Sequence, residues 1–309
     1  MSILSRVGRS LAPVLLGAAV FTAAPANAEV NVVTSIKPLE LLVRAVAPGD
    51  VQVTTLVPPG SSPHNYTLRP SQRGALENAD LVFWVGPDME TFLIRLLSAE
   101  EFHGRTIALS GEEIHEGGHE EHGHEHDHGH DHGEGEDPHL WVDPMLGLEM
   151  ARDIAKALAA QEGADQNAIS EKLAAFEVAL TEREAAIREQ LAPAKEIDIF
   201  AYHSALVRFT EHYELELAGI LTLNPELSPG ARHVAEVQDK LREATHPCLL
   251  TEPQFNRQWW RSITEGLDVT FSTWDPLAMD IEATETGYID FQQSIADAIL
   301  QCLPEDAQH

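Results

Sequence analysis

The first half of the chain alternates between short apolar runs and stretches in which apolar residues recur at helical spacing. One such stripe opens at Pro38 and ends before Pro48-Gly49-Asp50. The predicted order is a strand at 31–35, a helix at 38–47, a strand at 51–57, a helix from Pro70 or Ser71, and a strand at 80–85. Alternation of this kind predicts a mainly parallel sheet covered by helices.

The second half repeats the pattern without a close repeat of sequence. We predict strands at 197–201, 215–221 and 248–251, and helices at 204–213 and 231–244. Without its first 28 residues the chain has about 280 residues, which exceeds the size at which one core usually stops growing. The expected fold class is therefore α/β, with two lobes in tandem.

A long helix is predicted between the two halves. The run from Asn167 to Leu191 contains no Gly or Pro and carries an apolar stripe, formed by Ala168, Leu173, Phe176, Leu180 and Ile187. At 1.5 Å per residue it extends over roughly 35 Å, enough to run along both lobes. The alternative is a surface helix of one lobe. We assign 29–165 to an N-terminal lobe, 166–192 to a connecting helix and 193–309 to a C-terminal lobe.

The first 28 residues have the pattern of a secretory signal. Arg6 and Arg9 precede an apolar stretch at 11–21, and Ala26-Asn27-Ala28 is a small-residue cleavage site. The stretch is shorter than the roughly 20 residues that span a bilayer. We expect a periplasmic chain starting at Glu29 and no membrane insertion after cleavage; the alternative is an uncleaved anchor.

Charge narrows the possible partners. The chain contains 20 Lys and Arg residues and 50 Asp and Glu residues, which gives a formal net charge of −30. A nucleic-acid-binding protein needs a basic surface, so no nucleic-acid partner is expected. A negative field concentrates cations, although acidity can also serve solubility alone.

Residues 112–136 consist almost entirely of His, Glu, Asp and Gly. Such a segment cannot bury enough apolar area to fold, so we predict a disordered insertion. Imidazoles bind Zn²⁺, Cu²⁺ and Ni²⁺, and a flexible tract should hold several such ions weakly. The alternative is an inert linker. The predicted secondary ligands are His115, His119, His122, His124, His126, His128, His130 and His132.

Three other histidines are candidates for a specific site. His64 lies in the loop after the second predicted strand, His139 just before a helix, and His203 directly after a strand. In open α/β sheets, ligands bind beyond the carboxyl ends of the strands. A single histidine in such a place is more often a surface or core residue than a ligand, but three in matching contexts favour a ligand set.

The chain contains two cysteines, Cys248 and Cys302. In an exported protein two cysteines usually pair, and this bridge would add about 4 kcal/mol by the chain-entropy estimate. A metal–thiolate role is the alternative, without a CxxC spacing to favour it.

Several segments resemble the cluster A-I solute-binding proteins of ABC importers, and most of all their zinc branch, the ZnuA-type proteins. The similar segments are VTSIKPLELLV, PPGSSPHNYTLRPS, LENADLVFWVGPDMETFL, DPHLWVDP, LNPELSPG and TEPQF. The resemblance implies two Rossmann-like lobes joined by a long rigid helix, with a metal ion in the cleft between them. It also places a disulfide in the second lobe, which Cys248 and Cys302 fit.

Carried over by motif, the resemblance implies His64, His139 and His203 as metal ligands. The manganese branch has a carboxylate where His203 stands, and three neutral imidazoles suit Zn²⁺ better than Mn²⁺. Some zinc members have Glu before the first histidine, but here that residue is Pro63. The expected fourth ligand is Asp275 or a water, and Asp275 can instead be a cap before Pro276. Glu252 is a candidate acceptor for a ligand's free ring nitrogen.

The resulting hypothesis is a monomeric, non-enzymatic protein that captures Zn²⁺ and passes it to the permease and ATPase of an ABC zinc importer. A manganese importer component and a periplasmic zinc buffer without a transporter are the alternatives. A zinc hydrolase would also use three histidines and a water, but none of His64, His139 and His203 belongs to an HExxH motif.

Overall fold

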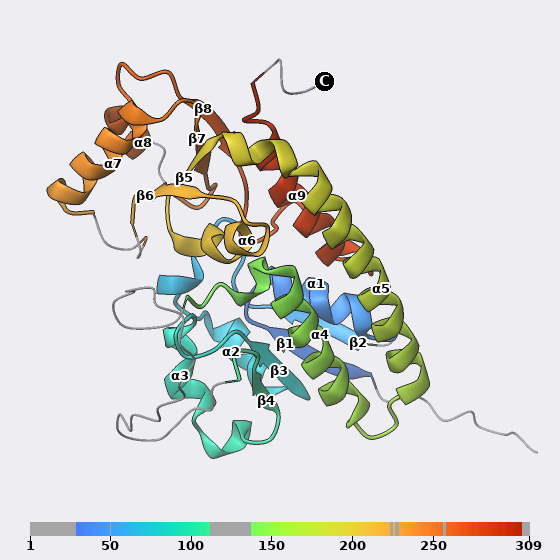
Figure 1. The fold of residues 1–309 in the computed structure, drawn as a ribbon. Helices are drawn as coiled ribbons and strands as arrows, with labels where there is room; N and C mark the ends of the chain where they lie inside the picture. Colours follow the sequence, from blue (N-terminus) through green and yellow to red (C-terminus); the bar gives the residue numbers. More distant parts are fainter. Residues whose placement is uncertain are drawn as a thin grey trace, which may run out of the picture.

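The computed structural model describes residues 29–49, 51–111, 137–222, 225, 229–255 and 258–304. The described chain forms two α/β lobes, as predicted, with a long helix along one side (Figure 1). The segments predicted to be a signal sequence, 1–28, and a histidine-rich insertion, 112–136, lie outside the described residues.

The N-terminal lobe is built on a four-stranded parallel sheet in the order β2-β1-β3-β4. Its strands are β1 (Val30–Thr34), β2 (Val51–Thr55), β3 (Leu81–Trp84) and β4 (Thr106–Ala108), and its helices are α1 (Lys37–Val46), α2 (Pro70–Glu77), α3 (Thr91–Leu97) and α4 (Pro144–Ala159). The central strand β3 reads LVFW and is buried throughout, as expected where helices cover both faces. The sequence analysis did not anticipate α3 or β4.

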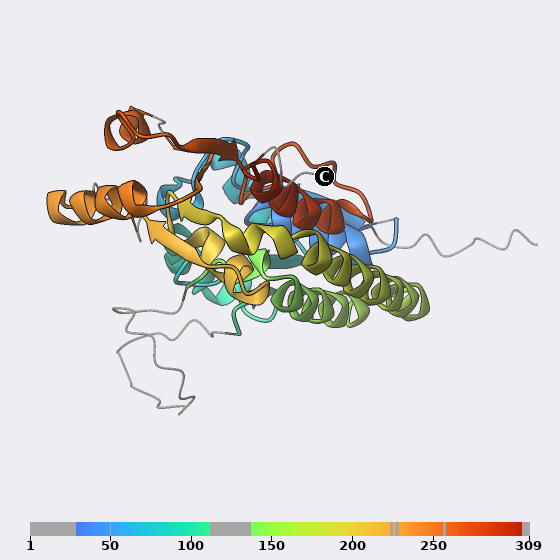
Figure 2. The same cartoon turned by 45° about the horizontal axis from the view of Figure 1, so that its top comes forward.

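The C-terminal lobe repeats this plan with the parallel order β6-β5-β7-β8. Its strands are β5 (Asp198–Ala201), β6 (Leu217–Ile220), β7 (Pro247–Thr251) and β8 (Thr270–Thr273), and its helices are α6 (Val207–His212), α7 (Ala231–Glu243), α8 (Gln258–Ile263) and α9 (Gly287–Leu300). The helix predicted at 204–213 is divided into a 3-10 turn, Ser204–Leu206, and α6. Figures 1 and 2 both show α7 and α8 at the end of this lobe far from the long helix.

The long helix is α5, Gln166–Gln190, within one residue at each end of the run predicted from Asn167 to Leu191. The side chain of Asp165 caps it by accepting a hydrogen bond from the backbone N–H of Ala168 at 3.0 Å. Its buried side chains are Ile169, Phe176, Leu180 and Ile187. They pack α5 against α1 and α4 of the first lobe and against α9 of the second, so the helix connects both lobes.

The two lobes also share a hydrophobic core. Helix α9 contacts β7 and β8 of its own sheet and also packs against α1 of the other lobe. One cluster of buried apolar side chains runs through α1, α4, α5 and α9. A separate smaller cluster fills the outer face of each sheet. This shared core sets the relative position of the ends of the two sheets that face each other.

A disulfide bond joins Cys248 in β7 to Cys302 just after α9, 54 residues further along the chain. The predicted pairing is therefore confirmed. The bond fixes the C-terminal end of α9 to the strand that leads into Thr251 and Glu252.

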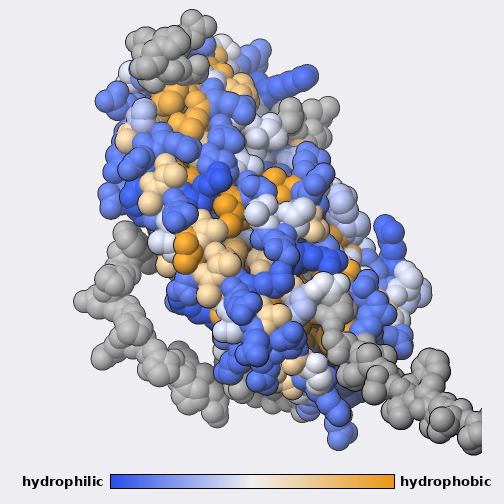
Figure 3. Space-filling view, turned by 90° about the vertical axis from the view of Figure 1, so that its right-hand side faces the viewer, coloured by the Kyte–Doolittle hydropathy of each residue, from blue (hydrophilic) through white to orange (hydrophobic). Residues whose placement is uncertain are grey.

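The described residues contain no candidate for a membrane-spanning helix. None of their helices combines the length and apolarity that a crossing would require. On the side where α5 lies, hydrophilic residues surround separate hydrophobic groups (Figure 3).

Candidate metal centre

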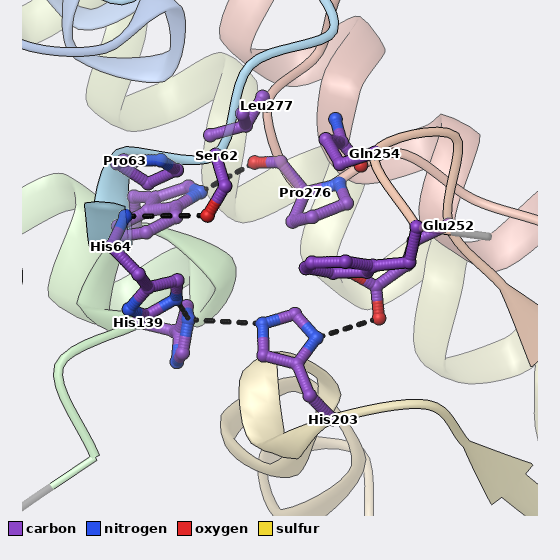
Figure 4. Close-up of a pocket in the computed structure, with 11 residues that line it drawn as sticks. Ser62, Pro63, His64, His139, His203, Glu252, Gln254, Pro276 and Leu277 are labelled. Carbon is purple, nitrogen blue, oxygen red and sulfur yellow. Dashed lines mark hydrogen bonds and ion pairs between the residues drawn. The ribbon is translucent and has the colours of Figure 1, made fainter. Parts of the chain in front are cut away.

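The three histidines predicted from strand-end positions lie together where the lobes face each other (Figure 4). His64 belongs to a short 3-10 turn, Pro63–Asn65, and its backbone N–H donates to the Ser62 hydroxyl at 3.3 Å. His139 immediately precedes the 3-10 turn Leu140–Val142 that leads into α4, and His203 follows β5. The first two therefore come from the N-terminal lobe and the third from the C-terminal lobe.

The ring nitrogens converge on one point. Nε2 of His139 lies 3.3 Å from Nε2 of His64 and 3.3 Å from Nε2 of His203. One ligand atom from each of the three residues lies within 4.8 Å of the others. Among the histidine, cysteine, aspartate and glutamate side chains of the described residues, these three histidines form the group that could hold a metal ion.

The cluster is shielded from solvent unevenly. His139 is 3% exposed and His203 2% exposed, whereas His64 is partly exposed. Apolar residues from both lobes complete the pocket, namely Trp141, Phe255, Pro276 and Leu277. The cluster therefore lies in a small pocket, and one of its candidate ligands, His64, is closer to water than the other two.

Two carboxylates contact the buried imidazoles at Nδ1, on the side of each ring away from the converging Nε2 atoms. Nδ1 of His203 lies 2.7 Å from Oε1 of Glu252, and Nδ1 of His139 lies 2.6 Å from Oδ1 of Asp137. Protonation at Nδ1 leaves the Nε2 lone pair free for a metal ion, which is how carboxylates usually orient metal-binding histidines. The acceptor position predicted for Glu252 is confirmed. The role of Asp137 was missed, although its place two residues before His139 was a signal for it.

The surroundings favour neutral imidazoles. Burial, together with repulsion from His139 and His203, lowers the pKa of His64 to about 3. Burial also lowers the pKa of His139, against the opposing effect of Asp137. Neutral nitrogen donors are the form that a borderline cation such as Zn²⁺ binds.

Asp275 does not join the three-histidine group. Its carboxylate accepts hydrogen bonds from the backbone N–H groups of Leu277, at 2.9 Å, and Met279, at 2.7 Å, and from the Gln254 amide at 2.6 Å. It therefore caps the turn that brings Pro276 and Leu277 to the pocket, as the alternative interpretation of Asp-Pro proposed. As a fourth ligand, Asp275 stays a prediction.

Two parallel-sheet lobes, a connecting helix and a histidine cluster between the lobes define the class of two-lobed solute-binding proteins. A comparison with protein families matches residues 32–302 to the family described as zinc-uptake complex component A, periplasmic. The chain belongs to this family, which confirms the resemblance found in the sequence.

Individual relatives agree with this assignment. The high-affinity zinc uptake system protein ZnuA of Yersinia pestis is 33% identical over 307 residues, which cover 94% of this chain and 96% of that protein. Among solved structures, the periplasmic zinc-binding protein TroA from Treponema pallidum has a TM-score of 0.74 at 20% identity, covering 89% of this chain and 99% of its own. A crystal structure of ZnuA has a TM-score of 0.71 at 22% identity, covering 88% and 100%.

Proposed function

We propose that this protein captures one Zn²⁺ ion with His64, His139 and His203 and delivers it to the permease of an ABC importer. The observation that carries the proposal is the convergence of three Nε2 atoms, two of them on rings whose Nδ1 atoms meet carboxylates. Three imidazoles leave a tetrahedral Zn²⁺ one open position, for Asp275 or a water. The names of the relatives, zinc uptake system proteins, support the choice of cargo.

Export and collection of the ion belong to the segments outside the described residues. We propose that 1–28 directs the chain to the periplasm and is then removed, in keeping with the family's description as periplasmic. The histidines of 112–136 would bind further ions weakly and raise the local zinc concentration beside the tight site. The proposed partners are a permease and its ATPase.

A chelator-competition titration tests this division of roles. The expected stoichiometry of tight binding is one Zn²⁺ per chain, both in the full chain and after deletion of residues 112–136, with the weak additional ions lost in the deletion. Simultaneous replacement of His64, His139 and His203 by Ala should abolish the tight step. Tight binding that survives the triple replacement, or that disappears with the deletion, would contradict the proposal.

Metal choice is tested in the same assay. Zn²⁺ should displace Mn²⁺ from the site, because nitrogen donors favour zinc in the Irving–Williams order. A preference for Mn²⁺ would support the manganese alternative instead.

A further inference from the structure

Arg208 connects the two segments that carry buried histidines. It lies on α6 of the C-terminal lobe, five residues after His203. Its guanidinium donates two hydrogen bonds to the backbone carbonyl oxygen of Asp137, from Nε at 2.8 Å and from Nη2. Asp137 lies two residues before His139 in the other lobe, so this contact crosses between the lobes directly beside the pocket.

The carbonyl that Arg208 binds belongs to the residue that orients His139. The carboxylate Oδ1 of Asp137 faces ring Nδ1 of His139 at 2.6 Å and also accepts from the His139 backbone N–H at 3.2 Å. Three contacts therefore follow one another, from Arg208 to Asp137, from Asp137 to His139, and from Nε2 of His139 to Nε2 of His203 at 3.3 Å. Together with the chain segment from His203 to Arg208, these contacts form a closed series.

This closed series of contacts restrains the distance between His139 and His203, because Asp137 and Arg208 connect the chain segments that carry the two histidines. A Lys could place only one compact ammonium on the same carbonyl, whereas the planar guanidinium supplies two N–H groups in a fixed arrangement. The helix that bears Arg208 also packs against the 3-10 turn that follows His139.

We propose that Arg208 is a positioning residue for the metal centre, which clamps Asp137 so that His139 and His203 stay at the separation one ion requires. This inference rests on the proposed zinc-binding function. It predicts that loss of the guanidinium mainly raises the rate of zinc release, because the ion is then held by less firmly positioned ligands.

The test measures the release rate of one equivalent of Zn²⁺ from the full chain into excess chelator, for wild type, Arg208→Ala, Arg208→Gln and Arg208→Lys. Disturbing groups that orient metal ligands usually costs about 10–100-fold in affinity, so release should be at least about tenfold faster for Ala and Gln, and intermediate for Lys. The absorption bands of the Co²⁺-loaded protein should change as well, since they report the geometry of the ligands.

Arg188→Ala is the matched control. Arg188 also binds a backbone carbonyl on the helix of Arg208, that of His212 at 3.1 Å, but it reaches no histidine of the centre. It should release zinc at the wild-type rate with unchanged Co²⁺ bands. Circular dichroism shows which of the Ala and Gln variants are folded, and the zinc release rate of a folded variant decides the test.

Wild-type release rates in the folded Arg208 variants would overturn the clamp while leaving the zinc-binding proposal intact. An equal acceleration in Arg188→Ala would also overturn it, because the effect would then be a general loosening of α6. Failure of the wild-type chain to bind one Zn²⁺ would instead refute the proposed function itself.

Discussion

At the scale of single residues, the candidate metal centre combines imidazoles that burial keeps neutral with carboxylates that orient two of them. Glu252 and Asp137 each meet one Nδ1 atom, and both carboxylates retain a second buried oxygen without a hydrogen-bond partner. Burial alone would raise the pKa of Asp137, but the hydrogen bonds and charge of His139, together with Arg208, hold that pKa below its usual value. The result is a site that presents lone pairs rather than protons to a cation.

The low pKa of His64 predicts how the metal-free protein responds to acid. In the unfolded chain this histidine titrates near 6.5, while in the folded protein its pKa is about 3. Between these values the unfolded state binds more protons, so folding stability falls as the pH drops through this range, by at most about 1.4 kcal/mol per pH unit for one group. His64→Gln should therefore lose less stability than wild type between pH 7.5 and 5.5.

Denaturant midpoints of the two metal-free proteins across that range measure the difference. The buried carboxyl of Glu90, whose pKa burial raises to about 7, acts with the opposite sign. It is common to both proteins and cancels in the comparison. Parallel curves would contradict a neutral, buried His64.

At the scale of helices and strands, the positions that define the site were accessible from the sequence. Buried strands such as β3 have continuous apolar sequences, and Pro and Gly mark their ends, so strand ends with histidines could be located. The missed strands β4 and β8 are both at sheet edges, where one side lacks a neighbouring strand and the apolar pattern is weak. Arg208 could not be predicted, because its partner depends on how the lobes pack.

The contact between α4 and α9 predicts an unusual effect of a helix-favouring substitution. A Cβ atom at Gly147 in α4 would lie 1.8 Å from the hydroxyl oxygen of Tyr288, which donates to the carbonyl of Trp141 at 2.8 Å. Gly147→Ala should therefore destabilise the protein by about 2–4 kcal/mol, since overpacking and a lost buried hydrogen bond outweigh the gain in helix propensity.

Urea unfolding measures that change, and Gly74→Ala in α2 is its control. Nothing lies within 4 Å of a Cβ atom at Gly74. Ala should there stabilise by up to about 1 kcal/mol. Equal effects at the two positions would show that Tyr288 does not limit the space at Gly147.

At the scale of the whole molecule, the lobes are coupled twice. The apolar cluster through α1, α4, α5 and α9 joins them away from the site, and the histidines meet between them. Each lobe contributes candidate ligands that the other lacks. Binding energy at the centre is therefore shared by the entire fold.

Zinc should accordingly stabilise both lobes together. Differential scanning calorimetry should show one transition for the metal-free chain, displaced as a whole by zinc. Free zinc at 100 times the Kd adds about 2.7 kcal/mol to the unfolding free energy. Two transitions, only one of which moves with zinc, would contradict this coupling.

If the protein transfers zinc as proposed, the uneven exposure of the three histidines gives that transfer a direction. His139 and His203 are enclosed by the lobes, and His64 is the member of the trio in contact with water. An acceptor group approaching through solvent would meet the bound cation from the His64 side and would exchange with that imidazole first. Unloading then proceeds bond by bond, and a recipient needs a single competing donor to begin it rather than a complete replacement coordination sphere.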